Sequence, residues 1–470
     1  MTTQRSMLID GSPVIGAGDA FSVINPATEE AICQCNMASV EQLDQAVSAA
    51  RRAFATWRQT PDAERRRLMH RIADRLDEHA DELAGIIVQE QGKPLALAQM
   101  EVGAAAAWTR YNADLEIPEP LLEDSDSRQV SASRKPLGVV ASITPWNWPL
   151  MIAIWHIMPA LRTGNTVVSK PSGLTPLNTL RLVEVINEVL PGGVVNVVMG
   201  EAEIGSAISA HEDIDKVIFT GSTPTGQRIM TNASGNLKRL TLELGGNDAA
   251  IVLPDTDLDA VAERIFDTAF INMGQTCAAL KRLYVHESQY EAMCSRLAEL
   301  AARQKVGDGF DPDTTFGPVQ NADQHRLVSA LVEDARANGG RIVCGGEAPR
   351  GPGYFYPPTI VADVSNGHRL VDEEQFGPVL PVVAYRDLEQ AVSMANDGAF
   401  GLGGSVWGSD LELANRLATQ LECGTVWINN HAEVLPNIPF GGSKMSGVGV
   451  EFGLEGLLEY TQLQVINSRK

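Results

Sequence analysis

Three features that would direct a chain to a membrane, out of the cell or to nucleic acid are missing here. No stretch approaches the roughly 18 consecutive apolar residues of a membrane-spanning helix, and residues 1–11 lack the apolar core of a secretion signal. Basic residues are few: 37 Lys and Arg stand against 59 Asp and Glu, a net charge of −22. Because such a surface repels nucleic-acid backbones and anionic lipids, we expect no nucleic-acid or membrane partner and a cytoplasmic protein.

Cysteine is also scarce, with six residues in 470. No CxxC pair is present, and Cys33 and Cys35 have no partner cluster that would form a zinc site, so we expect no metal. A disulfide framework is not expected in so long a chain, and free thiols fit a reducing compartment. One of these thiols is then available as a reagent. The six are Cys33, Cys35, Cys277, Cys294, Cys344 and Cys423.

The composition that remains is that of an ordinary globular protein, and 470 residues predict two or three domains. Ser39 and Gln42 form a capping-box pattern before a helix-rich stretch. From Gly138 onward short apolar runs alternate with helical patterns, which predicts an α/β fold with a parallel, doubly wound sheet that binds ligands at the carboxyl ends of its strands. A second α/β block runs from about Asp257 to Leu435. The strand candidates are Val139–Ile143, Thr166–Ser169, Val194–Val198, Lys216–Thr220, Leu240–Glu243 and Ala249–Leu253.

Two extended, mixed-polarity segments lie outside this alternation, Arg128–Leu137 and Glu459–Ser468. Such strands are either solvated sheet edges or surfaces that pair between subunits. The sequence leaves both interpretations open.

The most informative motif is 272–278, in which Cys277 follows a Gly/Gln turn and has small neighbours. This pattern suits an accessible nucleophile, although a buried structural cysteine is the competing interpretation, because access and a lowered pKa are not visible in sequence. In a second motif Glu243 ends an apolar strand and runs into a glycine turn. A carboxylate in an apolar setting can serve as a general base, while a solvated or helix-capping Glu is the alternative.

Two loops follow other strands in the same way. Asn147, in the rigid stretch 145–149, offers an amide donor for an oxyanion, although loop asparagines usually bond their own backbone. The stretch 219–223 leads from a strand into a glycine-led helix start, whose free N–H groups bind phosphate well. No GxGxxG is present, so the usual dinucleotide fingerprint is absent.

Taken together and in order, these motifs resemble those of the aldehyde dehydrogenase superfamily over essentially the whole chain. The resemblance begins at Asn25 and ends at Gly447. It implies that Cys277 is the nucleophile, that Glu243 is the general base, and that Asn147 and the backbone N–H of Cys277 form the oxyanion hole. The matching stretches between the two ends are PWNWPL, TGNTVVSKPS, FTGST, LELGGND, GQTC and EEQFGPVLP.

The implied reaction oxidises an aldehyde to its carboxylic acid through a thioester on Cys277, which a Glu243-activated water hydrolyses. NAD is the implied cofactor, with NADP also possible. Lys170 would bond the adenosine ribose and Glu374 the nicotinamide ribose. The cofactor-binding residues are predicted to be Thr144, Pro145, Trp146, Lys170, Ser172, Gly173, Gly200, Gly205, Phe219, Thr220, Gly221, Ser222, Leu244, Glu374 and Phe376.

The chain departs from the family pattern at two positions. Gly173 stands where many NAD⁺-preferring relatives carry a glutamate, so one barrier to NADP⁺ is missing. His156 stands where many carry a lysine thought to pair with a distal glutamate, here Glu451, in a proton path. Imidazole can relay protons near neutral pH, although a core histidine satisfied by backbone is the competing interpretation.

The expected substrate is an uncharged aliphatic or aromatic aldehyde. No arginine follows the nucleophile to pair with a second carboxylate, which disfavours a dicarboxylic semialdehyde. A semialdehyde dehydrogenase and a non-catalytic scaffold on the same fold are the alternatives. The residues expected to line an apolar tunnel are Trp148, Trp155, Ile271 and Leu435.

The resemblance also implies the organisation of the chain. A Rossmann-like cofactor domain would comprise residues 1–110 and 138–244, and an α/β catalytic domain residues 245–436. A small β oligomerisation element would join 111–137 with the C-terminal tail, 437–470. In the family such strands pair across subunits, so we expect a homodimer or a homotetramer.

Overall fold

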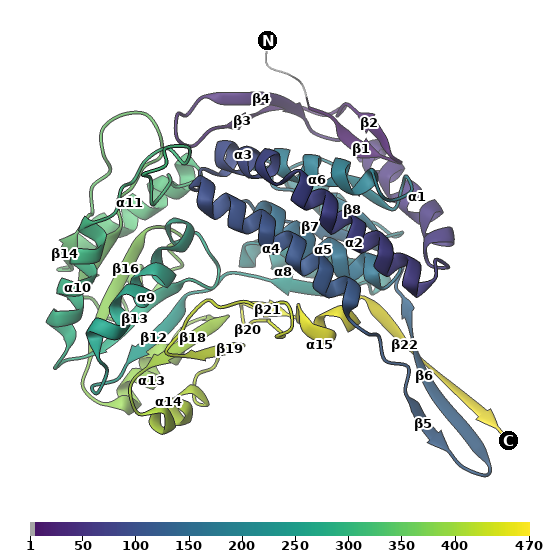
Figure 1. Cartoon of the computed structure of the whole chain (residues 1–470). Coiled ribbons are helices and arrows are strands. Elements are labelled where there is room, and N and C mark those ends of the chain that lie inside the picture. The colour runs from purple at the N-terminus through teal and green to yellow at the C-terminus, as the bar shows by residue number, and fades with distance from the viewer. Residues whose placement is uncertain (1–4) are drawn as a thin grey trace.

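The computed structural model describes residues 5–470. Residues 1–4, which belong to the expected cofactor domain and to the segment 1–11 considered as a secretion signal, lie outside the described residues. Two sheets with helices on their faces form the two bodies of the molecule, and a long strand pair projects from them (Figure 1). This confirms the predicted α/β class with parallel sheets. Within the described residues no helix is both long enough and apolar enough to cross a membrane.

The first sheet is mostly parallel and lies at the centre of the first body. Strands β7 to β11 pair in parallel, whereas β1, β2 and β21 join antiparallel at the edges. Every residue of β7 and β10 is buried, as expected for strands covered on both faces. The order is β2 (Ser12–Val14), β1 (Met7–Ile9), β9 (Val195–Val197), β8 (Thr166–Lys170), β7 (Val139–Ile143), β10 (Lys216–Thr220), β11 (Arg239–Glu243) and β21 (Gly447–Val448).

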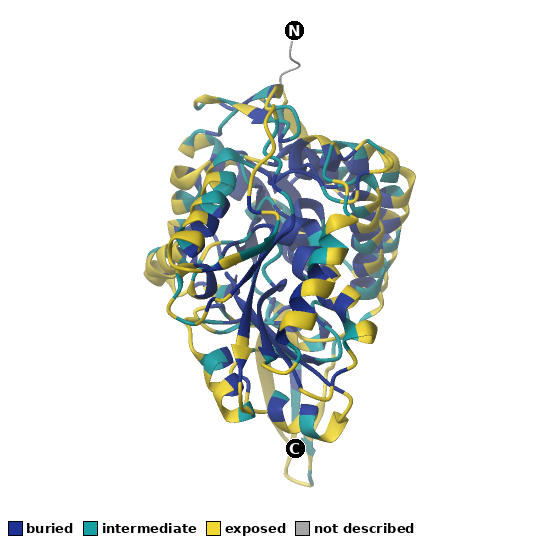
Figure 2. Ribbon diagram, turned by 90° about the vertical axis from the view of Figure 1, so that its left-hand side faces the viewer, coloured by how far each residue is buried: buried dark blue, intermediate teal, exposed yellow. Residues whose placement is uncertain are grey.

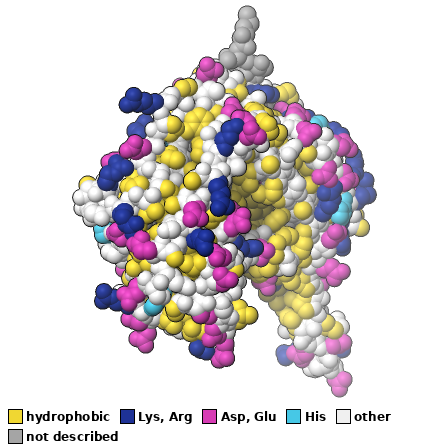
Figure 3. Space-filling view, turned by 60° about the vertical axis from the view of Figure 1, so that its left-hand side comes forward, with side chains coloured by type: hydrophobic (Ala, Val, Ile, Leu, Met, Phe, Trp, Pro, Cys, Tyr) yellow, Lys and Arg dark blue, Asp and Glu magenta, His cyan; other side chains and the backbone are white. Residues whose placement is uncertain are grey.

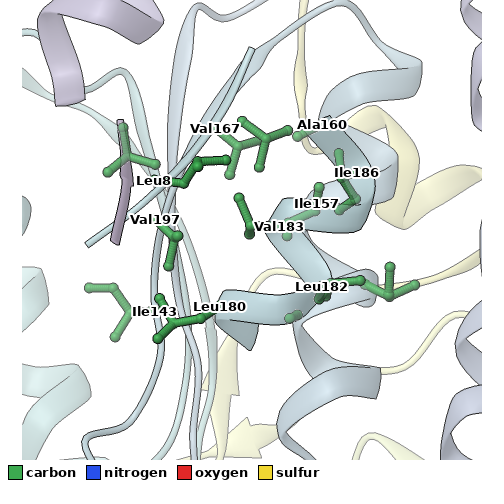
Figure 4. Packing of buried hydrophobic residues seen from close by; sticks show 14 of the residues in the cluster. Leu8, Ile143, Ile157, Ala160, Val167, Leu180, Leu182, Val183, Ile186 and Val197 are labelled. Atoms are coloured by element: carbon green, nitrogen blue, oxygen red, sulfur yellow. The ribbon is translucent and has the colours of Figure 1, made fainter. Parts of the chain in front are cut away.

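Helices cover both faces of this sheet and bury a continuous apolar core. Figure 4 shows Val167 and Val197 on the strands facing Ile157 and Val183 on two of the helices. The capping box predicted at Ser39 is confirmed, because its hydroxyl and the side chain of Gln42 each accept a bond from the other's backbone N–H. The helices are α1 (Val40–Trp57), α2 (Asp62–Glu78), α3 (Ala80–Gln91), α4 (Leu95–Asp114), α5 (Pro149–Arg162), α6 (Leu177–Asn187), α7 (Ala202–Ala210) and α8 (Thr223–Asn232).

The second sheet has its own core and begins directly after the glycine turn at 245–246. The predicted strand Ala249–Leu253 is observed as β12 and belongs here rather than to the first sheet. All pairs are parallel except β14 with β15. The order is β14 (Arg341–Cys344), β15 (Thr359–Ala362), β16 (Val379–Tyr385), β13 (Leu280–His286), β12 (Asp248–Val252), β18 (Gly403–Trp407) and β19 (Thr425–Ile428).

Helices also flank this second sheet, and Figure 2 shows buried strands between helices whose outer faces are exposed. Two short antiparallel pairs complete the strands of the two bodies, β3 (Ala20–Ile24) with β4 (Ala31–Asn36) and β17 (Phe400–Gly401) with β20 (Ser443–Lys444). The remaining helices are α9 (Leu258–Phe270), α10 (Tyr290–Ala302), α11 (Ala322–Ala337), α12 (Arg369–Asp372), α13 (Leu388–Asn396), α14 (Leu411–Ala418) and α15 (Gly453–Leu458), with 3₁₀ turns η1 (Ala233–Asn236) and η2 (Ile271–Gly274).

The two extended segments singled out in the sequence form one projecting sheet, the arm. β6 (Arg128–Pro136) lies between β5 (Leu121–Asp124) and β22 (Thr461–Arg469), and β6 and β22 are antiparallel partners along their full length. The arm extends away from both bodies (Figure 1). Whether a second chain pairs with it, and where the domains begin and end, stay predictions.

Candidate active site

A left-handed turn brings Cys277 to the crevice between the two sheets. Asn272, Met273 and Gly274 have φ values of 49°, 60° and 67°. A Cβ added at Gly274 would collide with the carbonyl oxygen of Gly377 and with Nζ of Lys281, so this position accepts only glycine. The turn ends the helical segment and leaves Cys277 half-buried.

Cys277 lines a cavity of about 200 Å³, the thiol cavity. Strand ends and loops from both sheets meet there, which is where ligands bind in open α/β sheets. The structure brings together two of the predicted catalytic residues, Asn147 and Cys277, in this wall. Its lining comprises Pro145, Trp146, Asn147, Thr220, Gly221, Ser222, Leu244, Gly245, Cys277, Gln324, Leu327, Glu374 and Phe376.

Asn147 is 2% exposed and is held from both sides. Its Nδ2 donates to the carbonyl of Gln275 at 2.9 Å, and its own carbonyl accepts from Nδ2 of Asn272 at 2.9 Å. An amide nitrogen carries two N–H donors, so one remains for an oxygen in the cavity. The bonds to the Cys277 turn therefore fix the amide beside the thiol.

Glu243 ends β11 and is 4% exposed. Within residues 5–470 neither of its carboxylate oxygens has a hydrogen-bond partner. Burial raises the pKa of this carboxyl well above its ordinary value, and the negative charge of Glu451 raises it further. A carboxylate of this kind is able to take a proton from a water molecule near neutral pH.

The thiol of Cys277 is surrounded by acidic groups. Burial raises its pKa above the ordinary value, and the charges of Glu243, Asp248 and Glu374 add to the shift. Glu374 accepts the backbone N–H of Gly246 at 2.9 Å, and burial raises its own pKa to about 7. The thiol is therefore protonated at neutral pH, and its reactivity depends on transfer of that proton.

A larger cavity of about 580 Å³, the cofactor cavity, adjoins the thiol cavity through a shared wall at 145–146 and 220–222. Thr144 and ten other residues predicted to bind cofactor line it, whereas Leu244, Glu374 and Phe376 line the thiol cavity. Gly200 lies beside it, since its carbonyl accepts Nζ of Lys170 at 2.8 Å. Those ten are Pro145, Trp146, Lys170, Ser172, Gly173, Gly205, Phe219, Thr220, Gly221 and Ser222.

The residues of the cofactor cavity fit a dinucleotide. The buried hydroxyl of Thr144 has no hydrogen-bond partner within the described chain. Gly221 and Ser222 precede α8, which has no side-chain cap, and within the described residues the N–H groups of Ser222 and Thr223 have no hydrogen-bond partner and can bind phosphate. Lys170 is buried at the wall, and burial lowers its pKa to about 8.

The four predicted tunnel residues lie in different settings. Trp148 is buried and donates from Nε1 to Thr276 at 2.9 Å. Trp155 packs at 4.7 Å against the ring of Phe452. Ile271 is half-buried at the Cys277 turn and Leu435 is 37% exposed. The tunnel itself stays a prediction.

The structure brings His156 and Glu451 together, the two residues that match the paired lysine and glutamate of many relatives. His156 Nε2 lies 3.3 Å from Oε1 of Glu451 and 3.0 Å from Oγ1 of Thr220. Its Nδ1 lies 3.0 Å from the Ser142 hydroxyl. The histidine is fully buried, and its recorded partners are side chains rather than backbone. Since Glu451 also acts on the pKa of Glu243, the three groups form one electrostatic system.

Sequence reasoning missed a buried pair that supports the Asn147 loop. Lys93 and Glu101 are both fully buried and form an ion pair at 2.6 Å. Nζ of Lys93 also donates to the carbonyl of Asn147 at 2.9 Å and lies 3.6 Å above the ring of Trp148. In the sequence, 92–94 indicates only a helix end, so no local signal reveals that the lysine points inward.

A second missed pair lies behind Cys277. Oδ2 of Asp248 is 3.5 Å from Nε2 of His431, and both side chains are fully buried. Nδ1 of His431 lies 2.9 Å from the Ser405 hydroxyl. Asp248 follows the LELGGN stretch directly, which was the available signal, but His431 is far along the chain.

Comparison with known proteins identifies the class to which this fold and site belong. The sequence profile of the aldehyde dehydrogenase family matches residues 14–466. The chain belongs to this family, so it is an oxidoreductase that acts on aldehydes. It is 42% identical to a phenylacetaldehyde dehydrogenase of Pseudomonas fluorescens, covering 97% of this chain and 94% of that one. It is 37% identical to a betaine aldehyde dehydrogenase of Bacillus subtilis, covering 98% and 96%.

Solved structures show the same fold. A betaine aldehyde dehydrogenase of Staphylococcus aureus in complex with NAD⁺ is 35% identical, with a TM-score of 0.96 over 99% of this chain and 95% of that one. A point mutant of an aldehyde dehydrogenase of Bacillus cereus is 36% identical, with a TM-score of 0.97 over 99% and 96%. The expected architecture is therefore confirmed.

Proposed function

We propose that Cys277 is the nucleophile, Glu243 the general base and Asn147 an oxyanion donor of an NAD⁺-dependent aldehyde dehydrogenase. The carrying observation is that Cys277 and the fixed amide of Asn147 share one cavity, while the buried, unpartnered carboxylate of Glu243 raises the pKa of the same thiol. Each group then has a separate task in the reaction.

The sulfur of Cys277, after loss of its proton, adds to the aldehyde carbon. The oxygen of the adduct becomes an oxyanion that Nδ2 of Asn147 and the backbone N–H of Cys277 stabilise. When bound, the nicotinamide ring supplies a hydride acceptor. Loss of hydride leaves a thioester on Cys277. Glu243 removes a proton from water, whose oxygen attacks this thioester, and the acid leaves as the thiol is restored.

His156 and Glu451 complete this proposal as a route for the proton that Glu243 receives. The 3.3 Å approach of the two side chains and the influence of Glu451 on the pKa of Glu243 support it. In this role His156 stands where many relatives carry a lysine, and its two ring nitrogens can pass a proton between neighbours.

We propose an uncharged aromatic or aliphatic aldehyde as the substrate. Cys277 and Phe452 both pack against an apolar cluster that includes Trp427 and Phe440. Lys93, buried near Asn147, is already paired with Glu101 and would not serve a second carboxylate. One named relative acts on an uncharged aromatic aldehyde and another on a cationic aldehyde. The charge of the preferred aldehyde therefore distinguishes these two substrate classes.

The test follows reduced-nicotinamide formation with phenylacetaldehyde, hexanal, betaine aldehyde and succinic semialdehyde, using NAD⁺ and NADP⁺ in parallel. Cys277→Ala is the blank, and Cys344→Ala, which removes another half-buried thiol on β14, is the matched control. The proposal is supported if wild-type protein and Cys344→Ala oxidise the uncharged aldehydes and Cys277→Ala does not. Preference for succinic semialdehyde overturns the substrate class, and no turnover with any aldehyde overturns the assignment of these residues.

The arm supports a further proposal, that two or four copies of the chain assemble through it. Its exposed apolar side chains are an unusual surface for a single chain (Figure 3). Light scattering after gel filtration should give two or four times the mass of one chain, and Val465→Glu should lower it. A monomer at micromolar concentration contradicts assembly. The exposed residues are Leu121, Leu122, Leu463, Val465 and Ile466.

We also place the protein in the cytoplasm. All six cysteines are free, which suits a reducing compartment. Fractionation of the source cells with an antibody to the protein tests this placement.

A further inference from the structure

The space beside Gly173 in the cofactor cavity is filled by another residue. A Cβ added at Gly173 would collide with Oε1 of Glu201 and would lie 3.2 Å from its Cδ. The carboxylate of Glu201 therefore lies against the backbone of Gly173, where a side chain at that position would begin. Both residues line the cofactor cavity, as does Lys170.

Glu201 stands at the N-cap of α7 but does not cap the helix. Its side chain accepts no bond from the free N–H groups of the first turn, and within residues 5–470 its carboxylate has no recorded hydrogen bond or ion pair. A glutamate used for capping or for a surface pair would have such a partner. The carboxylate is instead exposed in the cavity with its acceptor sites free.

Two cations line the same cavity, Lys170 and Arg228. Lys170 donates to the carbonyls of Pro171 and Gly200 at 3.0 and 2.8 Å, and the charge of Glu201 acts on it. Alone, these cations would attract a phosphate group. A carboxylate beside them accepts hydrogen bonds from a ribose diol and repels a 2′-phosphate.

We propose that Glu201 binds the adenosine ribose of the cofactor and makes the site select NAD⁺ over NADP⁺. Its carboxylate reaches the ribose from the turn before α7 instead of from position 173. The inference rests on the proposed placement of the adenosine end at Lys170. It assigns the selectivity to a residue on the turn before α7. The glycine at 173 then leaves room for the Glu201 carboxylate, so the ribose still has a carboxylate partner.

The experiment is equilibrium binding of NADH and NADPH to the full chain, measured by fluorescence without any aldehyde. Wild-type protein should bind NADH more tightly. Glu201→Gln should weaken NADH about tenfold, because a hydrogen bond to a charged group is lost, and should strengthen NADPH. Glu203→Gln is the matched control: Glu203 is exposed on the same helix and does not line the cavity. It should leave the ratio of the two dissociation constants unchanged.

Two further measurements separate ribose binding from a general charge effect. 2′-Deoxy-NADH should bind wild-type protein less tightly than NADH does, and this difference should vanish in Glu201→Gln. Adding Gly173→Glu to Glu201→Ala should restore the NADH preference, because a carboxylate returns to the same space from the other side.

A ratio that stays within twofold in Glu201→Gln, or that Glu203→Gln changes equally, overturns the role of Glu201. Aldehyde oxidation that persists with such an unchanged ratio overturns this inference alone. Binding of neither dinucleotide to wild-type protein overturns the proposed cofactor together with it.

Discussion

The thiol cavity and the cofactor cavity share one wall, yet the physical conditions around Cys277 are opposite to those around Gly173, in another part of the cofactor cavity. Around Cys277 the ionisable groups are buried or half-buried, and their removal from water raises the pKa of Glu243, Glu374 and the thiol itself. Around Gly173 the deciding group, Glu201, is exposed and has no recorded protein partner within the described chain. Burial thus adjusts the proton affinity of the groups around Cys277, where we propose that covalent bonds form. At Glu201, an accessible charge is proposed to select between ligands without any covalent step.

The thiol cavity also has an internal support that Glu201 lacks. The carbonyl of Asn147 is held by Lys93 and Asn272, and Lys93 is itself held by Glu101. A fixed donor costs no reorganisation when the oxyanion forms. Glu201, in its proposed role, is an exposed carboxylate on the turn before α7 and has only to meet two hydroxyls. The following predictions test this contrast.

The largest expected effect is on stability, from removal of the buried cation. Lys93→Met leaves Glu101 buried without its partner and should lower the free energy of unfolding by about 3–5 kcal/mol. Arg67→Ala, which breaks the exposed pair with Glu64, should cost far less, because solvent screens that pair. Urea unfolding followed by tryptophan fluorescence measures both. Adding Glu101→Gln to Lys93→Met should recover part of the loss; equal losses in the two single variants would contradict the contrast.

The next effect is on catalysis alone. Asn147→Ala removes one oxyanion donor and should lower kcat about 100- to 1,000-fold while NADH binding stays unchanged. Ser172→Ala, in the cofactor cavity, should instead change cofactor binding and leave the chemical step intact. Steady-state rates and NADH titration separate these outcomes. An Asn147→Ala enzyme whose loss appears only in cofactor affinity would show that the two cavities do not divide the work as described.

A smaller effect concerns pH. Glu451 raises the pKa of Glu243, and Glu243 acts as a base only when deprotonated, so kcat should rise with pH through that pKa. Glu451→Gln removes the negative charge, lowers the pKa of Glu243, and should move the acidic limb of the kcat profile downward by about one pH unit. Glu455→Gln, an exposed change on α15, is the control. A limb that stays in place, or moves upward, contradicts this coupling.

Cys277 and Glu243 could be singled out from the sequence because each sits in a local pattern. Cys277 follows a turn that requires glycine at 274, and Glu243 ends a strand whose last three residues are buried. Both signals are contained in a few neighbouring positions. The α/β class followed in the same way from alternation along the chain.

What the sequence did not reveal depends on contacts between distant segments. Lys93 meets Asn147 only after α4 and α5 pack together, and His431 meets Asp248 from the far edge of the second sheet. Gly173 appeared to leave the ribose without a carboxylate, because nothing local places Glu201 beside it. β12 likewise belongs to the second sheet because the glycine turn at 245–246 leads the chain there. The pattern of apolar residues does not indicate the direction of that turn.

The central claim is that Glu243 acts after Cys277 has been acylated, and one measurement tests it most directly. Glu243→Gln protein is mixed with NAD⁺ and phenylacetaldehyde, NADH is followed on the millisecond scale, and the intact chain is weighed by mass spectrometry. We predict a burst of one NADH per subunit, slow turnover afterwards, and an acyl group on Cys277. Slow NADH formation without a burst, on an unmodified Cys277, would place Glu243 in the first half of the reaction and contradict the account.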